Sequence, residues 1–336
     1  MMKRLLQWLV QYAEGALALW AHGFLGHLGL AREGTWGTAV AATDYAELMS
    51  ENLSTTIDRF ETRNIFAGFY EPDDFAGARR TAGGIVLAGN PMPMGHLLRA
   101  AMGTSSASTV LSGFLYTMNH TTVKSEFAAG VARPPYTLEV HRDVTSSHQY
   151  AGALLNRLTM AMAPNQDLRI TAEWLAKARL LIAKTTPTFP GSPVDPFTFD
   201  TCSLQLAGAA TARIEALTVV IDNQLEGILT LNNSNEIARV RATGPQLIRI
   251  SGTMDFTDVT EEQDFINQTE RVLKFTMTRA NSFALLVEAP RFVYTAYPMG
   301  MPGRGRLTVG FEGRARYLVS SATALLAQLT VTKSNY

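Results

Sequence analysis

The chain has 336 residues, of which 46% are hydrophobic and 17% are charged, and its formal net charge is zero. The hydrophobic content excludes a disordered chain, and the lack of net positive charge excludes tight binding of nucleic acid along its backbone. A sparsely charged, neutral surface is also poor at keeping a monomer soluble. We therefore expect much of the surface to be covered by other subunits, with an unusually neutral monomer as the alternative.

Residues 1–30 have a composition of their own. Lys3 and Arg4 precede an apolar run, a pattern that resembles a signal peptide. The longest uncharged stretch, residues 15–31, is shorter than the ~20 apolar residues of a spanning helix, and it contains four glycines. We predict an N-terminal extension over residues 1–30, and we favour a peripheral helix there over an export signal or a membrane anchor.

The rest of the chain has the pattern of a mainly β protein with one short helix in each of two parts. In the first part, a strand over Ile85–Ala88 precedes a run with helical spacing from Met94 to Ala101. In the second part, apolar and polar residues alternate over Ile248–Phe256. A capping-box sequence at Thr260–Gln263 then predicts the start of a helix. Further alternating strands are predicted over residues 273–277, 307–311 and 329–331.

Three sequence blocks occur twice and in the same order, which is the mark of an internal repeat. Glu51–Asp58 aligns with Glu215–Asp222 at four identical positions of eight. Ile170–Arg179 aligns with Leu307–Arg316 at three identical positions. The two copies of this second block differ by a fixed offset in residue number. The same offset aligns Leu138, Val140 and Arg142 of one further strand with Phe275, Met277 and Arg279.

The repeat predicts two tandem domains of the β-sandwich or barrel type. We place the first over residues 31–195, with an inserted loop near residues 103–135, and the second over residues 196–336. Each copy also has a long polar connection, over residues 59–82 and 223–246. Because connections of this length in a compact domain are usually functional, we expect both to reach a neighbouring subunit or ring.

The sequence contains no motif for catalysis or cofactor binding. It lacks a phosphate-binding P-loop, a His-Glu-x-x-His zinc sequence and a Gly-x-Ser-x-Gly nucleophile elbow. Its single cysteine, Cys202, excludes an intrachain disulfide and a multi-cysteine zinc site. We predict no catalytic residue, no cofactor and no metal, and we expect the protein not to be an enzyme.

Several short motifs resemble those of tail tube proteins from long, flexible-tailed (siphovirus-type) bacteriophages. They comprise an opening Glu33–Ala39, a strand Ser50–Leu53, a glycine-rich strand Ala82–Gly89, a helix Leu97–Gly103 and a Tyr-x-Gly element in Tyr150–Asn156. The resemblance spans roughly residues 29–332. The segment before Gly29 departs from the usual start of the family.

The resemblance implies a structural protein of the virion. Tail tube subunits are β-sandwich domains that form rings, and the rings stack into a hollow tube through which double-stranded DNA passes. For a chain with two copies, the resemblance implies a homotrimeric, pseudo-hexameric ring. It further implies contacts with the tape measure, tail terminator and distal tail proteins, assembly in the host cytoplasm, and no stable membrane association.

Two other classes of protein stay open from the sequence. Another phage tail or baseplate component, or a contractile-system tube, has the same fold and differs in its assembly. A monomeric β-sandwich that binds a ligand is the second alternative. Such a protein needs a concave cluster of aromatic residues, which the sequence does not indicate.

Two groups of residues are predicted to carry the tube function. On the strands over residues 53–58 and 248–256, the polar side of the alternation points away from the core and into the channel. These channel-lining residues are Ser54, Thr56, Asp58, Arg249, Ser251, Thr253 and Asp255. Hydroxyl and acidic groups attract DNA phosphates weakly, and Asp255 is expected to offset the charge of Arg249. Contacts between rings or subunits are predicted for Arg63, Glu71, Asp73, Asp74, Arg79, Asn232, Asn233, Arg239 and Arg241.

Overall fold

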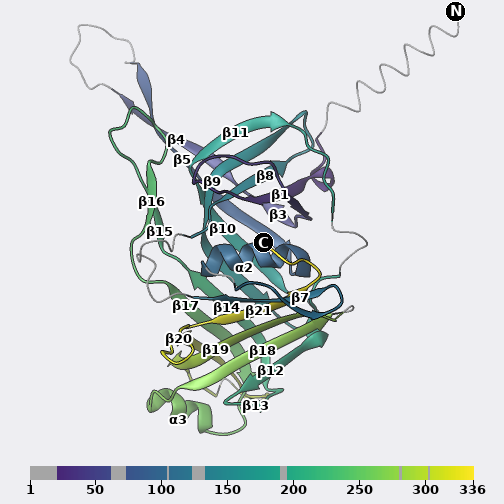
Figure 1. Cartoon of the computed structure of the whole chain (residues 1–336). Coiled ribbons are helices and arrows are strands. Elements are labelled where there is room, and N and C mark those ends of the chain that lie inside the picture. Colours follow the sequence, from purple (N-terminus) through teal and green to yellow (C-terminus); the bar gives the residue numbers. More distant parts are fainter. Residues whose placement is uncertain are drawn as a thin grey trace, which may run out of the picture.

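The computed structural model describes residues 21–61, 73–103, 106–122, 133–189, 195–279, 282–301 and 303–336. Strands dominate these residues, and two α-helices accompany them (Figure 1), which confirms the predicted mainly β fold. Nineteen strands belong to one connected sheet, and two form a separate hairpin. No helix within the described ranges is long and apolar enough to cross a bilayer.

Within the described residues, the first half of the chain contributes eleven strands and the longer of the two helices. The bounds are β1 His27–Arg32, β2 Asp44–Ala46, β3 Ser50–Glu51, β4 Ser54–Glu61, β5 Asp74–Ala88, α2 Pro91–Met102, β6 Thr109–Ser112, β7 Leu115–Thr121, β8 Tyr136–His141, β9 Ser146–Met162, β10 Arg169–Ala176 and β11 Ala178–Ala183. A short 3-10 helix, Gly23–Leu25, precedes β1.

The second half contributes the remaining strands and the shorter helix. The bounds are β12 Cys202–Leu206, β13 Ala209–Ala210, β14 Ile214–Asp222, β15 Leu225–Ile228, β16 Arg239–Ala242, β17 Leu247–Asp255, α3 Thr260–Ile266, β18 Arg271–Arg279, β19 Phe283–Ala296, β20 Thr308–Ala315 and β21 Leu326–Val331. A 3-10 helix, Phe199–Thr201, leads into β12.

Both halves pair their strands in the same order. The first half runs β4–β5–β10–β9–β8–β1, and β11 also pairs with β9. The second half runs β14–β17–β20–β19–β18–β12, and β21 also pairs with β19. Each helix follows the second strand of its series, so α2 comes after β5 and α3 comes after β17. The long strand β9 serves two layers, because one end pairs with β8 and β11 and the other with β10.

The register of the two halves also agrees. Gly83 on β5 lies opposite Trp174 on β10, and Gly252 on β17 lies opposite Phe311 on β20. Added Cβ atoms on Gly83 and Gly252 would lie 2.6 and 2.3 Å from a backbone carbonyl oxygen of the neighbouring segment. Both aromatic rings are buried in the core. The two glycines and the two rings therefore hold equivalent places in the two halves.

The two halves join through a set of contacts that we call the internal junction. β14 pairs with the C-terminal end of β9, from Leu217 opposite Met162 to Asp222 opposite Arg157. β7 of the first half pairs with β21 of the second half. Helix α2 lies between the halves (Figure 1), against β9 on one side and against β19 and β21 on the other. The internal junction thus consists of β9, α2 and β7 from the first half, with β14, β19 and β21 from the second.

Helix α2 is nearly all buried and is tied to the second half at its C-terminal end. Pro91 begins the helix, and Gly103 ends it in a left-handed conformation with φ 84°. The Ala101 carbonyl oxygen accepts hydrogen bonds from Asn223 Nδ2 and Gln246 Nε2, both at 3.2 Å. The helix predicted over Met94 to Ala101 is therefore confirmed, with bounds that reach further at both ends.

Several local predictions are wrong. Thr260 is the first residue of α3 and not its cap, and Asp258 Oδ1 accepts the Thr260 backbone N–H at 2.8 Å. The insertion near residues 103–135 contains the β6–β7 hairpin, because β7 finds a pairing partner in β21. β1 begins at His27, so the predicted boundary at residue 30 falls inside a strand. Residues 1–20 of the predicted extension lie outside the described residues.

Candidate functional site

One face of the sheet is polar across seven adjacent strands, in the order β4–β5–β10–β9–β14–β17–β20. Side chains alternate between the two faces of a strand, and directly paired residues share a face. Directly opposed residues can be followed from strand to strand across this sheet. The series begins with Ser54 of β4 opposite Ala82 of β5 and reaches Thr218 of β14 opposite Ser251 of β17. Both sets of predicted channel-lining residues therefore lie on the same face, which we call the polar face.

All the predicted channel-lining residues reach the surface of the chain. Ser54, Thr56, Asp58, Arg249 and Thr253 are exposed, and Ser251 and Asp255 are half-buried. On β17 the intervening residues Ile248, Ile250 and Met254 are buried in the core. The alternation of β17 thus separates a core side from a surface side.

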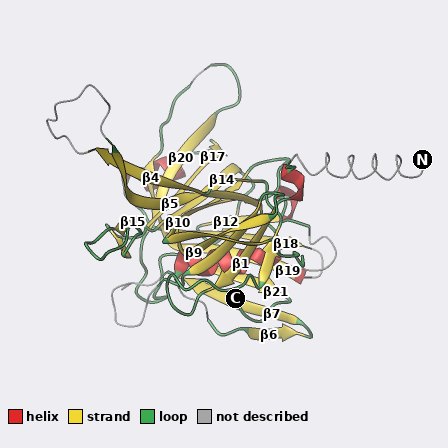
Figure 2. Ribbon diagram, turned by 90° about the horizontal axis from the view of Figure 1, so that it is seen from above, coloured by secondary structure: helices red, strands yellow, loops and turns green. Residues whose placement is uncertain are grey.

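The apolar side predicted for residues 53–58 is buried only at its start, because Leu53 is buried in the core whereas the corresponding side of β4 is not. Ile57 is exposed and Thr55 is half-buried. Among the described residues β4 pairs only with β5, so one of its edges carries no partner strand. β4 continues away from the body of the chain (Figure 2), where the described residues provide no second layer.

Five arginines and five carboxylates point from the strands onto the polar face, and Arg306 and Glu215, which contact each other beside Asp255, add one charge of each sign. The arginines are Arg80, Arg157, Arg169, Arg249 and Arg314, and the acidic residues are Asp58, Glu173, Asp222, Asp255 and Glu312. Arg157 Nη2 lies 2.9 Å from Asp222 Oδ2, and Arg157 Nη1 lies 3.8 Å from Glu173 Oε1. Arg80 Nε lies 3.4 Å from Asp58 Oδ2. Positive and negative groups therefore alternate over the face instead of forming a field of one sign.

The sequence prediction includes only two of these seven strands. The charges on β9, β10, β14 and β20 were reachable from the sequence as alternating polar residues, for example over residues 169–175 and 308–314. Their assignment to the same face needs the strand register, which sequence alternation alone does not supply.

Asp255 does not offset Arg249, contrary to the prediction. Arg249 lies opposite Arg314 on β20, and Asp255 lies six residues further along β17, about 20 Å away at the usual strand rise. Asp255 contacts Arg306 instead, with 2.5 Å between Oδ1 and Nη2. Glu312 on β20 and Asp222 on β14 are the carboxylates diagonal to Arg249.

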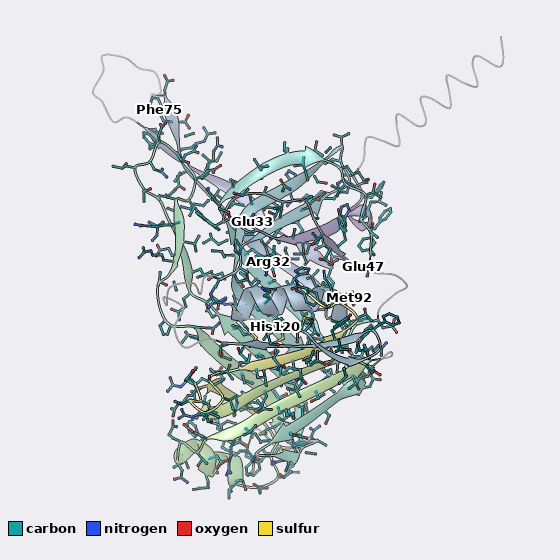
Figure 3. The ribbon with its side chains drawn as sticks, in the orientation of Figure 1. Arg32, Glu33, Glu47, Phe75, Met92 and His120 are labelled. Atoms are coloured by element: carbon teal, nitrogen blue, oxygen red, sulfur yellow. The ribbon has the colours of Figure 1, made fainter. Side chains whose placement is uncertain are left out.

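The first predicted connection is a projecting β ribbon made by the outer ends of β4 and β5 (Figure 2). Phe60 and Phe75 stack across it with ring centroids 5.7 Å apart, and both are exposed. Figure 3 shows Phe75 at the outer part of the ribbon. Arg59 Nη1 lies 2.5 Å from Asp74 Oδ2. The described part of this connection is strand and not loop, because cross-strand pairs support it.

The predicted contact residues of this ribbon are all at the surface where they are described. Asp73, Asp74 and Arg79 are exposed. Arg63 and Glu71 lie outside the described residues.

The second predicted connection contains the β15–β16 hairpin, which runs alongside the ribbon (Figure 1). The Arg79 backbone N–H donates to the Asn235 carbonyl oxygen at 2.7 Å, so the two connections touch. The four predicted contact residues of this segment, Asn232, Asn233, Arg239 and Arg241, are exposed. The structure therefore brings the two predicted connections together on one side of the chain.

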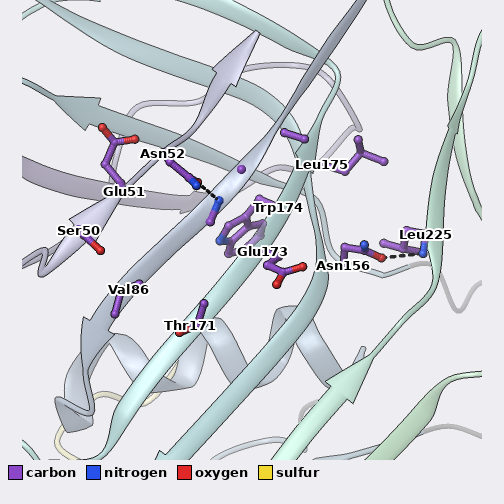
Figure 4. A pocket seen from close by; sticks show the side chains of 13 residues that line it. Ser50, Glu51, Asn52, Val86, Asn156, Thr171, Glu173, Trp174, Leu175 and Leu225 are labelled. Carbon is purple, nitrogen blue, oxygen red and sulfur yellow. Dashed lines mark hydrogen bonds between the residues drawn. The ribbon is translucent and has the colours of Figure 1, made fainter. Parts of the chain in front are cut away.

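A hollow of ≈ 610 Å³ lies beside β3, β5 and β10 (Figure 4). Its amide groups already bind backbone N–H groups: Asn52 Oδ1 accepts from Gly84 at 2.5 Å, and Asn156 Oδ1 accepts from Leu225 at 2.7 Å. The Trp174 ring at its base is buried in the core. The hollow therefore does not present the convergent polar groups and aromatic walls that are typical of ligand sites.

The titratable groups of the described ranges do not form a reactive centre. Within those ranges, no group of three or more His, Cys, Asp and Glu side chains could hold a metal ion. Burial raises the pKa of the Cys202 thiol to about 11, so little reactive thiolate is present at neutral pH.

One comparison with known proteins gives a match. A family model described as phage tail tube protein matches residues 23–331. The match begins before β1 and ends with the last residue of β21, so it covers both halves of the sheet. No curated protein matches the chain significantly.

Proposed function

The chain belongs to the phage tail tube protein family, and from this membership we propose that it polymerises into stacked rings that form the hollow tail tube for DNA passage. The family is one of structural virion proteins and not of enzymes. The chain is accordingly a structural component of the phage tail.

We infer a ring of three chains that supplies six similar sectors, as in a long, flexible tail. The repeated pairing order and the equivalent glycine–aromatic pairs support a duplicated tube domain. The internal junction supports side-by-side assembly, because it already joins two such units by backbone pairing. Closed rings leave no free sheet edge, which removes the aggregation hazard of an all-β subunit.

The observation that carries the channel assignment is the polar face with its balanced charge. In a ring, the face of the inner sheet that points away from the core lines the lumen. Five arginines and five carboxylates on that face leave no net positive field, so DNA phosphates are not held as they pass. We propose that Ser54, Thr56, Asp58, Arg249, Ser251, Thr253 and Asp255 belong to this wall.

The ribbon and the β15–β16 hairpin are the proposed contacts between stacked rings. They project together from one side of the chain and expose the aromatic pair Phe60 and Phe75. Exposed aromatic side chains on a projecting element are suited to burial against a partner. Asp73, Asp74, Arg79, Asn232, Asn233, Arg239 and Arg241 would surround that contact, with tape measure, tail terminator and distal tail proteins as partners at the tube ends.

A tube of a contractile system, or another tail or baseplate part, is the second candidate function. The same fold serves these assemblies, and they differ from a flexible tail tube in what surrounds the tube. A monomeric ligand-binding role has no support from the hollow beside β3, β5 and β10.

The assembly proposal is tested on the purified full chain. Electron microscopy is expected to show hollow tubes or rings, and native mass spectrometry is expected to give a smallest closed ring of three chains. A stable closed ring of six chains would contradict the duplicated-domain proposal. A protein that stays monomeric over a wide range of salt and concentration would contradict the tube function itself.

The channel assignment predicts that Asp58→Lys with Asp255→Lys leaves the fold intact, because both carboxylates reach solvent and surface ion pairs contribute little. The variant tubes are expected to retain duplex DNA at low salt and to release it as salt rises. A matched control, Glu47→Lys with Asp200→Lys, makes the same change in net charge at exposed positions off the polar face. Equal DNA retention by both variants would contradict the channel assignment.

A further inference from the structure

Apolar side chains are exposed on two surfaces of the folded chain, one on each half and both away from the internal junction. The equivalent side chains at the internal junction are buried. We call β4 and β11 the first end, and α3 with residues 298–301, which follow β19, the second end. Contiguous exposed apolar surface on a soluble protein usually marks an interaction site. The internal junction shows what covers such residues when two halves meet.

On β4 the comparison concerns one isoleucine from each half. Ile57 and Ile221 are aligned in the repeated block, and each sits on the strand that pairs with the helix-leading strand of its half. Ile57 is 46% exposed, whereas Ile221 is fully buried. Ile221 lies opposite Leu158 of β9 in the internal junction. The partner strand that buries Ile221 has no counterpart on β4 within the described residues.

On β11 the comparison concerns one leucine from each half. Leu181 lies opposite His148 on β9, and Leu329 lies opposite Leu285 at the equivalent place on β19. Leu181 is 63% exposed, whereas Leu329 is fully buried. Leu329 sits on β21, which α2 contacts and which pairs with β7, with Met118 opposite Leu329. β11 receives no such cover among the described residues.

At the second end, the comparison concerns one apolar residue from each helix. Counted from the first helical residues, Leu97 of α2 and Ile266 of α3 hold the same position. Leu97 is 1% exposed, whereas Ile266 is 59% exposed. Helix α2 packs against strands of both halves, but α3 packs chiefly against β19 of its own half.

The segment after β19 shows the same difference. Ala296, the last residue of β19, lies opposite Glu312 of β20. If this register is continued beyond the end of β19, Met301 comes to lie opposite Leu307. In the first half Met160 lies opposite Ile170, which aligns with Leu307. Met301 is 84% exposed, whereas Met160 is fully buried.

We propose that the second end of one copy docks on the first end of the next copy in the arrangement of the internal junction. The occupant of the exposed surface is therefore a second copy of this chain. β4 extends the sheet of the preceding copy along residues 298–301, and α3 of that copy covers Leu181. The proposal rests on the proposed ring-forming function and specifies which surfaces close the ring.

The internal junction also predicts the register of this contact. Ile221 lies opposite Leu158 and Asp222 lies opposite Arg157, so Ile57 should lie opposite Met299 of the neighbouring copy. The contact would bury Ile57, Leu181, Ile266 and Met301 together, and burial of apolar side chains is the main favourable contribution to association. Because the two ends differ from each other, the contact is heterologous and yields a closed ring at one rotation.

Cysteine cross-linking tests the register in the full-length chain. In a Cys202→Ala background, Ile57→Cys combined with Met299→Cys is expected to give disulfide-linked dimers and trimers on mild oxidation. Residues directly opposite in an antiparallel pair have Cα atoms about 4.5–5.5 Å apart, within disulfide range. Each single-cysteine variant should stay unlinked. A matched pair, Ile57→Cys with Val319→Cys, keeps an exposed apolar site away from the junction and should also stay unlinked.

A charge substitution tests the same contact without cysteine. Leu181→Asp places a charge where α3 should dock and is expected to reduce the assembled fraction at least tenfold, while the exposed position leaves the monomer folded by circular dichroism. Val319→Asp is the control at an equally exposed apolar residue. Rings that form normally with Leu181→Asp, or rings whose Ile57 and Met299 cysteines do not link, would overturn this junction and leave the tube function standing. Absence of rings in the parent chain would overturn the function as well.

Discussion

The two halves of the chain share a pairing order but differ in how much structure they present at their borders. Within the described residues, the first half has a helix of 12 residues followed by the additional β6–β7 hairpin, whereas the helix of the second half has 7 residues and leads directly into β18, the counterpart of β8. The longer helix and the hairpin both lie at the internal junction. These two differences between the halves therefore both add structure to the contact inside the chain.

This difference distinguishes the internal junction from the proposed contact between neighbouring chains. In a ring built from identical single domains, the two contacts would be the same. Inside the chain, α2 is tied to the second half through the Ala101 carbonyl oxygen, and Thr122 and Thr323 hydrogen-bond through their hydroxyl groups at 3.0 Å. At the proposed contact between chains, the corresponding helix α3 is short, and its Ile266 is exposed. A contact that must form between separate chains is expected to rely on fewer pre-ordered elements, since each chain must first fold alone.

The largest expected effect concerns the glycines that hold equivalent places in the two halves. An added Cβ on Gly252 would lie 2.3 Å from the Ala216 carbonyl oxygen and 2.9 Å from the Phe311 ring, and one on Gly83 would lie 2.6 Å from the Asn52 carbonyl oxygen. Backbone atoms cannot move aside cheaply, so Gly83→Ala and Gly252→Ala should each lower the free energy of unfolding by about 1–3 kcal/mol. Urea denaturation of the unassembled chain measures this change.

Gly310→Ala is the control for this pair of substitutions. Gly310 lies on β20, and the nearest atom to its added Cβ is 4.0 Å away, so its replacement should change stability by less than about 0.5 kcal/mol. If only one of the two glycine substitutions lowers the stability, the two halves are packed differently around these glycines. That result would contradict the equivalence of Gly83 and Gly252.

Local patterns in the sequence predicted the elements well. The repeated blocks around Ile57 and Ile221 mark corresponding strands, and the spacing from Met94 to Ala101 marks the helix that forms there. These signals work because helix and strand periodicities depend on residues that are close in sequence. The β6–β7 hairpin escaped prediction because its stability comes from β21, about 200 residues away along the chain.

The polar face was predictable only in part, for the same reason. Alternation correctly separates Arg249 and Thr253 from the core, but it says nothing about the neighbouring strands. The register decides that Arg249 faces Arg314 and that Asp255 meets Arg306. On β4, alternation predicted a covered apolar side, but Ile57 is exposed and no described strand pairs with the second edge of β4.

A further expected effect is a loss of stability in acid that is confined to the first half, since all six histidines of the chain precede residue 149. His27 on β1 and His141 on β8 are buried and stack with ring centroids 5.0 Å apart. Burial lowers the pKa of His27 and the adjacent His141 lowers it further, although Glu139 opposes the shift. Burial likewise lowers the pKa of His141, with Lys184 acting in the same direction. Both imidazoles are therefore neutral in the folded chain over a pH range in which they are protonated in the unfolded chain.

A histidine pKa that is lower in the folded state than in the unfolded state stabilises the fold fully above the ordinary pKa of about 6.5. Stability then falls with pH, by about 1.4 kcal/mol per pH unit for each histidine that stays neutral, until the folded-state pKa is reached. Hydrogen exchange on the unassembled chain, corrected for intrinsic rates, should show β1 and β8 losing protection between pH 7 and pH 5. Their counterparts β12 and β18 carry no histidine and should lose less. His27→Phe, which keeps an apolar ring on β1, should flatten this dependence, and an equal loss of protection in both halves would contradict the assignment to His27 and His141.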